Sequence, residues 1–344
     1  PKDLRPIVLS AVAGKLFTKA LTLRLRSQWK PMQADQLSAQ KGAQTLDGST
    51  ALTHLIHLSQ ERDQGLYAIK LDIAQAFDRT THDAVARYLT STSISREAGV
   101  LFHIIRNSRV NLRIGRQEWT QELQCGLLQG STYSAEIFAR TVDWFLGPLV
   151  QRWHEAGVNG WMHELGLLLY ADDTILLAPT PTALQVKLNE VICTLKSLGL
   201  QVSQHKCIVL ADTRGKAEAD LPRIHLEGAV VPVQSSITFL GVTCGFGVSE
   251  EDVLRPLKVR AVNTFWSLKG VFCRARMPLG PRLRLLSSYV ASKWRWCIPV
   301  IRPLQSVLRS LDSLQTSLCG YLLKWQWDPL LCGVRNFISA RRAT

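Results

Sequence analysis

The run Leu167-Leu168-Leu169-Tyr170-Ala171-Asp172-Asp173-Thr174-Ile175-Leu176-Leu177 decides the fold of this chain. Its two apolar arms have the length of strands and are too short to span a membrane. The polar break between them predicts a hairpin turn, which places Asp172 and Asp173 at the tip of a hairpin with buried arms. Adjacent carboxylates repel unless a cation lies beside them, and Mg²⁺ prefers oxygen ligands of this kind. The alternative is a polar turn without a metal, because aspartate is common in turns.

The size and composition of the chain indicate a folded protein with more than one subdomain. It has 344 residues, of which 46% are hydrophobic and 20% charged, which suits a sizeable core and not a disordered polymer. No apolar run could span a bilayer and no N-terminal signal pattern occurs, so we expect no membrane partner. The start at Pro1-Lys2-Asp3 predicts a piece of a longer reading frame. The eight cysteines lack zinc-binding spacing, so we expect reduced, mostly buried thiols of an intracellular protein.

The positive charge is concentrated at the C-terminal end. The net charge is +14, and from Val253 onward there are 16 of the 41 Lys and Arg but only 2 of the 27 Asp and Glu. The remainder of the chain is therefore neutral overall. Such asymmetry predicts a polyanion-binding surface, with nucleic acid as the leading partner. A solvated basic helical face and a membrane-surface helix are the alternatives.

Hydrophobic periodicity predicts a mixed α/β region from about residue 66 to residue 245. Helices are expected at about 12–29, 50–62, 81–89, 94–106, 134–153 and 182–198. Strands are expected at 66–73, 207–210 and 238–242, a hairpin at 110–119, and loops at 36–49 and 126–131. After Glu250 the pattern becomes helical and basic, and we expect the interleaved Trp294, Trp296, Trp325 and Trp327 to belong to the core.

A third carboxylate joins the pair at the hairpin tip. Asp72 comes at the end of the strand predicted at 66–73. If that strand lies beside the hairpin in one sheet, Asp72, Asp172 and Asp173 converge on one site. Two metal ions about 3.5–4 Å apart are a known device for in-line phosphoryl displacement, in which the work is mostly positioning and charge stabilisation. The three aspartates are thus candidate ligands of a metal pair.

Further motifs stand around this constellation, and their order is informative. They are Leu4-Arg5-Pro6-Ile7 with Lys15 and Arg24-Leu25, Gly42 to Thr50, Leu71 to Asp78, Gly126 to Ser131, Tyr170 to Asp173, Gly199 to Lys206, and Phe239-Leu240-Gly241. In this order they resemble the fingers signature, the fingers loop, motifs A, B, C and D, and the primer grip of reverse transcriptases. The chain is most similar to the reverse transcriptases of non-LTR (LINE-type) retrotransposons. A single tetrapeptide would be a weak signal, whereas the ordered set is highly specific.

The resemblance implies an α+β, right-hand polymerase fold with fingers, a palm built on an antiparallel sheet, and a helical thumb. It places fingers at 1–65, palm with motif A at 66–92, a fingers/palm connection at 93–119, palm with motifs B to E at 120–245, and a basic helical thumb with a C-terminal extension at 246–344. The implied activity is that of an RNA-directed DNA polymerase in retrotransposition, with priming typically at a nicked genomic target. A eukaryotic element of this type would act in the nucleus.

The resemblance also assigns roles near the chemistry. Asp72, Asp172 and Asp173 are the implied catalytic residues and ligands of two Mg²⁺ ions, for which Mn²⁺ is a possible substitute, and the carbonyl of Ile73 could add a ligand. The implied substrate-binding residues are Arg5 for the triphosphate, Phe77 as the steric gate against a ribose 2′-hydroxyl, Gln129 and Gly130 near nucleotide and template, Tyr170, and Lys206. Lys206 is either the general acid for pyrophosphate or a surface lysine, and Asp78 is expected to hydrogen-bond rather than bind metal.

The implied partners are an RNA template, a DNA primer or target, and dNTPs. The expected nucleic-acid contacts are Gly42, Phe239, Leu240 and Gly241, together with the thumb residues Lys258, Arg260, Lys269, Arg274, Arg276, Arg282 and Arg284. Phosphate contacts by such a thumb give affinity that is independent of sequence.

The chain departs from the family pattern at two places, neither of which removes a metal ligand. Ala43 follows Gly42 where phenylalanine is usual, and Thr132-Tyr133-Ser134-Ala135 stands where motif B usually continues with two prolines. The alternatives are a group II intron maturase-like enzyme, a viral RNA-dependent RNA polymerase, and a catalytically inactive RNA-binding relic of a retroelement. Phe77 and Tyr170-Ala171 argue against a polymerase that makes RNA.

Overall fold

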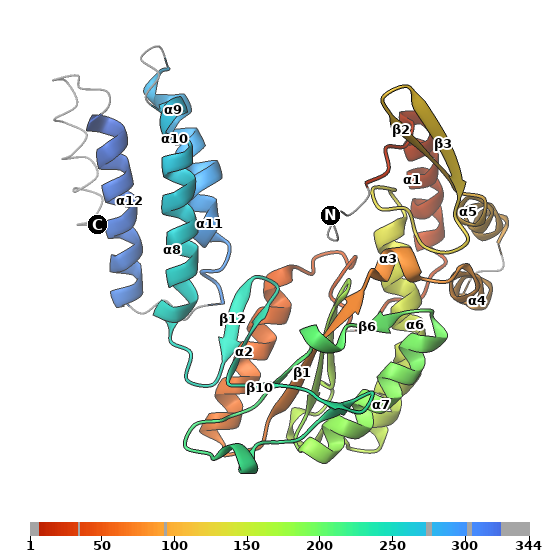
Figure 1. Cartoon of the computed structure of the whole chain (residues 1–344), viewed down its shortest axis with the longest axis horizontal. Helices are drawn as coiled ribbons and strands as arrows, with labels where there is room; N and C mark the ends of the chain where they lie inside the picture. The colour runs from red at the N-terminus through yellow and green to blue at the C-terminus, as the bar shows by residue number, and fades with distance from the viewer. Residues whose placement is uncertain (1–6, 34, 93–94, 273–276, 301–304, 325–344) are drawn as a thin grey trace. The chain divides into compact units, whose positions relative to one another are not determined.

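The computed structural model describes residues 7–33, 35–92, 95–272, 277–300 and 305–324 (Figure 1). The chain forms two compact units, Pro1–Gly247 and Val248–Thr344. Among the described residues, no helix combines the length and apolar character needed to cross a membrane. Arg5, Arg274, Arg276, Trp325 and Trp327 lie outside the described residues.

A six-stranded sheet forms the centre of the first unit (Figure 1). Its main path runs β10 (Val233–Gln234), β7 (Ile208–Leu210), β1 (Tyr67–Ala74), β5 (Asp173–Ala178) and β4 (Leu167–Tyr170), and β6 (Gln201–Val202) pairs with β1. All pairs are antiparallel except β10 with β7. Strands were expected at 66–73 and 207–210 and a hairpin at 167–177, and the structure confirms these elements within one residue at most ends.

The alternation along β1 separates the core from the polar face of the sheet. Successive side chains of a strand point to opposite faces. Ile69, Leu71 and Ile73 are buried in the hydrophobic core, so Lys70 and Asp72 belong to the other face. The core is completed by α6 (Ser134–Glu155) and α7 (Pro181–Ser197), which contact each other, while α7 also contacts β1 and β5. The strand therefore presents its charged residues away from the helices that bury its apolar side.

The other helices of the first unit largely match the periodicity. They are α1 (Val12–Arg26), α2 (Thr45–Glu61), α3 (Ala76–Arg79), α4 (His82–Thr92) and α5 (Arg96–Arg106). The expected loop at 36–49 is wrong at its end, because α2 begins five residues before the predicted start at Thr50. The backbone N–H of Gln44 donates to Asp47 Oδ2 at 2.7 Å and caps this first turn.

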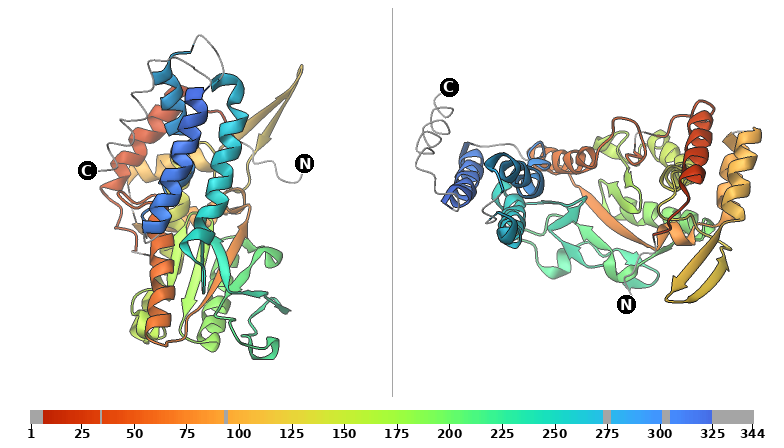
Figure 2. Two further views of the ribbon diagram at one scale, coloured as in Figure 1. Left: turned by 90° about the vertical axis from the view of Figure 1, so that its left-hand side faces the viewer. Right: turned by 90° about the horizontal axis from the view of Figure 1, so that it is seen from above.

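Three hairpins of the described residues lie outside the central sheet, and the smallest consists of β8 (His225–Leu226) and β9 (Ala229–Val230). β2 (Arg109–Ile114) and β3 (Gln117–Glu122) form the predicted hairpin, which projects from this unit as the gold ribbon of Figure 2. The single strand predicted at 238–242 is wrong: β11 (Ser236–Phe239) and β12 (Val242–Gly245) pair with each other. Leu240 and Gly241 have φ of +48° and +85° and reverse the chain between them. The apolar Leu240 hides this turn in the sequence.

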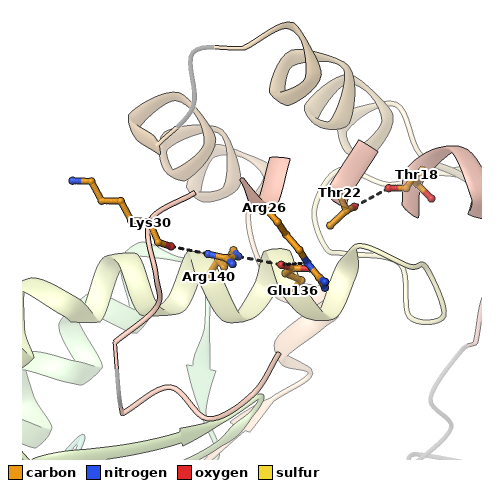
Figure 3. A network of polar contacts seen from close by, with 6 residues as sticks. All are labelled: Thr18, Thr22, Arg26, Lys30, Glu136 and Arg140. Atoms are coloured by element: carbon orange, nitrogen blue, oxygen red, sulfur yellow. Dashed lines mark hydrogen bonds and ion pairs between the residues drawn. The ribbon is translucent and has the colours of Figure 1, made fainter. Parts of the chain in front are cut away.

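A polar network fastens α1 to α6 (Figure 3). Arg26 donates from Nε and Nη2 to the Glu136 carboxylate, at 2.8 and 2.6 Å. Arg140 Nε also donates to Glu136 Oε1, at 3.3 Å, and its Nη1 donates to the carbonyl of Lys30 at 3.0 Å. Glu136 is only 5% exposed. A buried carboxylate is thus satisfied by two guanidinium groups, one of them from a distant helix.

The second unit is helical, as expected after Glu250. It contains α8 (Glu250–Ser267), α9 (Lys269–Phe272), α10 (Leu279–Leu285), a π-helical turn η4 (Leu286–Ala291), α11 (Ser292–Arg295) and α12 (Gln305–Lys324). Trp294 is buried, which confirms its expected place in the core, and Trp296 is half-buried.

The described cysteines are free thiols, and their burial varies. Cys207, Cys244 and Cys297 are buried, Cys319 is half-buried, and Cys125 and Cys193 are exposed.

Candidate active site

The register of the sheet brings the three predicted carboxylates together. Asp72 of β1 lies directly opposite Asp173 of β5 in an antiparallel pair. Side chains at directly opposite positions share one face, with Cβ atoms about 4.5–5.5 Å apart. Tyr170 pairs with Asp173 across the β4–β5 hairpin, so Ala171 and Asp172 form its two-residue turn. Ala171 has a φ of +55°, an uncommon value for a residue other than glycine.

Two lysines lie beside these carboxylates. Lys70 Nζ is 3.6 Å from Asp173 Oδ1, and Lys206 Nζ is 3.4 Å from Asp72 Oδ2. The Lys206 side chain is 70% exposed, whereas that of Lys70 is 23% exposed. Burial raises the pKa of Asp173 above its ordinary value; the Lys70 ammonium opposes this rise, and the charges of Asp172 and Asp72 add to it. The site thus has excess negative charge that the two lysines offset in part.

The donor set suits a hard divalent cation. Within the described part of the chain, no three or more His, Cys, Asp or Glu side chains are already grouped as a metal site. The three carboxylates nevertheless supply only oxygen donors, as Mg²⁺ and Mn²⁺ prefer. Two of them, Asp173 and Asp72, each lie beside a lysine ammonium. A bound cation would neutralise the same negative charge that these ammonium groups offset. We conclude that Asp72, Asp172 and Asp173 fit such an ion by their chemistry.

The segment after β1 fixes the position of Phe77. Gln75 adopts a φ of +50° and turns the chain into the short helix α3. The Phe77 ring packs against Phe138 of α6, with centroids 4.7 Å apart. Its carbonyl accepts a hydrogen bond from the Leu127 N–H at 2.7 Å. Phe77 is therefore held between the loop at 126–131 and α6, while remaining half-buried.

Gln129 and Gly130 hold this loop against two other segments. Gln129 Nε2 lies 3.2 Å from both carboxylate oxygens of Asp78, so Asp78 accepts a hydrogen bond, as expected. The Gln129 carbonyl accepts from the Val8 N–H at 2.8 Å. Gly130 has a φ of +101°, and a Cβ there would lie 2.8 Å from the Val8 carbonyl oxygen. Only glycine fits this close approach of two backbones.

Comparison with known families shows to which family the chain belongs. Residues 1–244 match the family described as reverse transcriptase (RNA-dependent DNA polymerase). The chain belongs to this family. Members of the family generally use divalent metal ions.

Relatives from retrotransposons support this assignment. The chain is 23% identical over 331 residues to a retrovirus-related Pol polyprotein from the type-1 retrotransposable element R2 of Popillia japonica, covering 91% of the chain and 44% of the relative. It is 26% identical over 214 residues to the R2 polyprotein of Nasonia vitripennis, covering 61% and 20%. A probable RNA-directed DNA polymerase from transposon BS of Drosophila melanogaster is 26% identical, covering 87% and 34%. The chain thus spans less than half the length of these relatives.

The fold is the right-hand polymerase fold of reverse transcriptases, in an α+β chain, which confirms the predicted class. Among solved structures, apo telomerase from Candida Tropicalis is similar at a TM-score of 0.50 and 13% identity, covering 90% of this chain and 51% of the telomerase chain. At this identity the similarity concerns the fold alone. The predicted relation to non-LTR retrotransposons is confirmed by the relatives.

In this reverse transcriptase chain, the segment that resembles the primer grip, Phe239-Leu240-Gly241, lies against α2. Ser49 Oγ donates to the Phe239 carbonyl at 3.1 Å, and a Cβ on Gly48 would lie 3.1 Å from the Phe239 ring. Phe239 is fully buried, so its predicted contact with nucleic acid through the side chain is wrong. Its ring instead lies close to Gly48 of α2, whereas Leu240 is half-buried and Gly241 is exposed.

The basic residues of the second unit divide into two groups. Arg260, Lys269 and Arg284 are exposed. Lys258 is 16% exposed and donates to Glu251 Oε1 at 2.9 Å and Ser310 Oγ at 2.6 Å. Arg282 is fully buried and donates from Nε to the Met277 carbonyl at 2.9 Å, so the prediction that it contacts a duplex is wrong. The Arg282 guanidinium thus lies in the interior of this unit.

Lys70 is the site residue that sequence reasoning missed. It precedes Asp72 by two positions in an otherwise apolar strand, so strand alternation places both on the same face. A lysine at this position of the strand was the signal from which the sequence could have predicted a place beside Asp72. Gly42 has a φ of +92° and is exposed in the loop before α2, where its predicted contact with the template is sterically open.

Proposed function

We propose that this chain is the polymerase part of a non-LTR retrotransposon protein and extends a primer 3′-hydroxyl with dNTPs on RNA templates and also on DNA templates. The single observation that carries the proposal is the cross-strand pairing of Asp72 with Asp173, next to Asp172 in the hairpin turn. This arrangement stands in a chain of the reverse transcriptase family. A polar turn without a catalytic role would not require a third carboxylate, on a neighbouring strand, directly opposite it.

The three aspartates would hold two Mg²⁺ ions, with Mn²⁺ as a substitute and the Ile73 carbonyl as a further ligand. When bound, such ions activate the 3′-oxygen and neutralise the triphosphate and the leaving pyrophosphate. Lys206, whose Nζ lies 3.4 Å from Asp72 Oδ2, would donate a proton to the leaving pyrophosphate. In this proposal Arg5 binds the triphosphate, since a guanidinium forks onto phosphate oxygens.

We assign substrate selection to α3, which carries Phe77, and to the loop at 126–131 that packs against it. Phe77, fixed by Phe138 and by the Leu127 N–H, would exclude a ribose 2′-hydroxyl and so favour dNTPs. Gln129 and Gly130 would border the nucleotide and the template. Tyr170, paired with Asp173, would lie under the primer end. The packing of Phe77 on a core residue supports a rigid gate, which is what steric discrimination requires.

Nucleic acid would be bound by exposed positions of both units. In the first unit these are Gly42 and the Leu240-Gly241 turn. In the second they are Arg260, Lys269 and Arg284, whose exposed charges suit phosphate contacts. Priming at a nicked genomic target would make the nucleus of a eukaryotic host the place of action.

Primer extension tests the proposal. The intact protein is incubated with oligo(dT) on a poly(rA) template, Mg²⁺ and dTTP, beside the matched variant Asp172→Asn. We expect extension by the unchanged protein and a loss of at least about a hundredfold in the variant, with primer–template binding retained. Binding without extension by the unchanged protein would identify an inactive RNA-binding relic. Equal extension by both proteins would overturn the catalytic assignment.

A further inference from the structure

We propose that Lys70 is a positioning residue that ties the β11–β12 hairpin to the Asp173 carboxylate and serves as the counter-ion of that carboxylate until a divalent cation binds. The inference deepens the proposed function, on which it rests, because it concerns the same three aspartates. It assigns a role to a residue that lies outside the motif positions that match the family pattern.

The Lys70 ammonium connects three elements. Lys70 itself is in the middle of β1, where it pairs with Ile175 of β5 and Ile208 of β7. Its Nζ donates to the carbonyl of Thr238 in β11 at 2.8 Å and lies 3.6 Å from Asp173 Oδ1. A single group of three donors therefore holds the hairpin and the carboxylate at once.

The Lys70 side chain is more buried than the Lys206 side chain. Both ammoniums lie within 4 Å of a carboxylate of the site, but the Lys70 side chain is 23% exposed and that of Lys206 is 70% exposed. An exposed pair is screened by water and contributes little, whereas a partly buried pair is screened less. Lys70 is thus the more effective of the two in offsetting the repulsion among Asp72, Asp172 and Asp173.

An ammonium and a metal ion beside the same carboxylate compete. Two cations near one oxygen repel each other, so the charge of Lys70 weakens the binding of a divalent ion while it stabilises the metal-free protein. Its hydrogen bond to Thr238 does not depend on the metal and keeps β11 in place relative to β1. Removing the charge should therefore have opposite effects on metal affinity and on metal-free stability.

The experiment measures melting temperature and Mn²⁺ affinity, neither of which needs polymerase activity. The intact protein and Lys70→Met are melted in EDTA and in saturating Mn²⁺, and Mn²⁺ is titrated calorimetrically. We expect Lys70→Met to melt about 3 °C lower in EDTA, with most of that loss recovered in Mn²⁺. The apparent Kd for Mn²⁺ should fall about fivefold, which is the effect expected in water when one unit charge is removed from the immediate neighbourhood of the bound ion.

Further variants separate the two parts of the role. Lys70→Gln removes the charge but keeps an amide donor for Thr238, so its Mn²⁺ affinity should rise as in Lys70→Met. Lys70→Arg should restore the behaviour of the unchanged protein. In an Asp173→Asn background, Lys70→Met should no longer alter the gap between the EDTA and Mn²⁺ melting temperatures. Lys216→Met removes an exposed lysine that has no ion pair to the three aspartates within the described chain, and should leave both measurements unchanged.

An equal loss of melting temperature in EDTA and Mn²⁺, with unchanged Mn²⁺ affinity, would reduce Lys70 to an ordinary structural lysine and overturn the inference. If Lys70→Met does not fold, Lys70→Gln still decides the inference through the Mn²⁺ titration, in which an unchanged Mn²⁺ affinity would overturn it. Failure of the unchanged protein to extend a primer would instead count against the proposed function, and the two failures are therefore distinguishable.

Discussion

Replacement of Arg26 by methionine should destabilise the first unit through the buried carboxylate of Glu136. Methionine keeps the length and apolar stem of the side chain but removes all three charge-assisted hydrogen bonds, of 2.8, 2.9 and 2.6 Å. Breaking a buried ion pair by removing one partner costs about 3–5 kcal/mol. Glu136 keeps Arg140 at 3.3 Å, and the Arg26 side chain is 43% exposed, so we expect a smaller loss of unfolding free energy than this range, about 2 kcal/mol.

The assay is urea unfolding monitored by circular dichroism, with Arg24→Met as the matched control. Arg24 is on the same helix and forms an ion pair of 2.7 Å with Glu97, but its side chain is 73% exposed. Its loss should therefore cost only about 0.5 kcal/mol. In a double-mutant cycle with Glu136→Gln, most of the Arg26→Met cost should disappear. If Arg26→Met and Arg24→Met cost the same, or if the cycle shows no coupling, the argument from burial is refuted.

Three further predictions concern the steric gate, a half-buried carboxylate and the second unit. Phe77→Val should raise rNTP incorporation relative to dNTP incorporation at least about tenfold in single-nucleotide extension, because the ring that would meet the 2′-hydroxyl is removed; an unchanged ratio would exclude Phe77 as the gate. Burial raises the pKa of Asp143 to about 6, against a backbone hydrogen bond from Gln33 and the charge of Arg140. The folded state thus holds this proton more tightly, and stability falls as pH rises from about 4 to 6. Asp143→Asn should therefore gain stability relative to the unchanged protein above pH 6, by about 2 kcal/mol, and show no such gain near pH 4; urea titrations at both pH values check the sign. Replacing Arg260, Lys269 and Arg284 by glutamine should weaken primer–template binding for every sequence and lower its salt dependence by roughly one unit of slope per residue, measured by fluorescence anisotropy; an unaltered slope would place the duplex elsewhere.

Much of the secondary structure was predictable because it follows from local patterns. The helix at 134–155 and the strand at 67–74 were located by the spacing of apolar residues, which reflects the geometry of each element alone. The strand predicted at 238–242 failed because an apolar residue, Leu240, adopts a positive φ that the sequence does not signal. The early start of α2 was missed because Gln44 is not a common N-cap residue.

The fate of individual charged residues was much less predictable. Arg282 and Arg284 are two residues apart in one basic helix, yet the first is fully buried and the second exposed. The sequence alone treats them alike, because burial depends on which neighbouring elements pack on each face. For the same reason, the cationic partners of Asp72 and Asp173 were not predicted as a pair.

By itself, the sequence determined that a strand carrying Asp72 and a hairpin carrying Asp172 and Asp173 exist, since apolar alternation and a polar break are properties of short segments. It also determined, through the order of its motifs, the family to which the chain belongs. Only the tertiary structure decided that Asp72 stands opposite Asp173, and that Lys70 reaches both Asp173 and the Thr238 carbonyl. The physical reason is that strand register and side-chain burial arise from contacts between segments about a hundred or more residues apart, which no local pattern encodes.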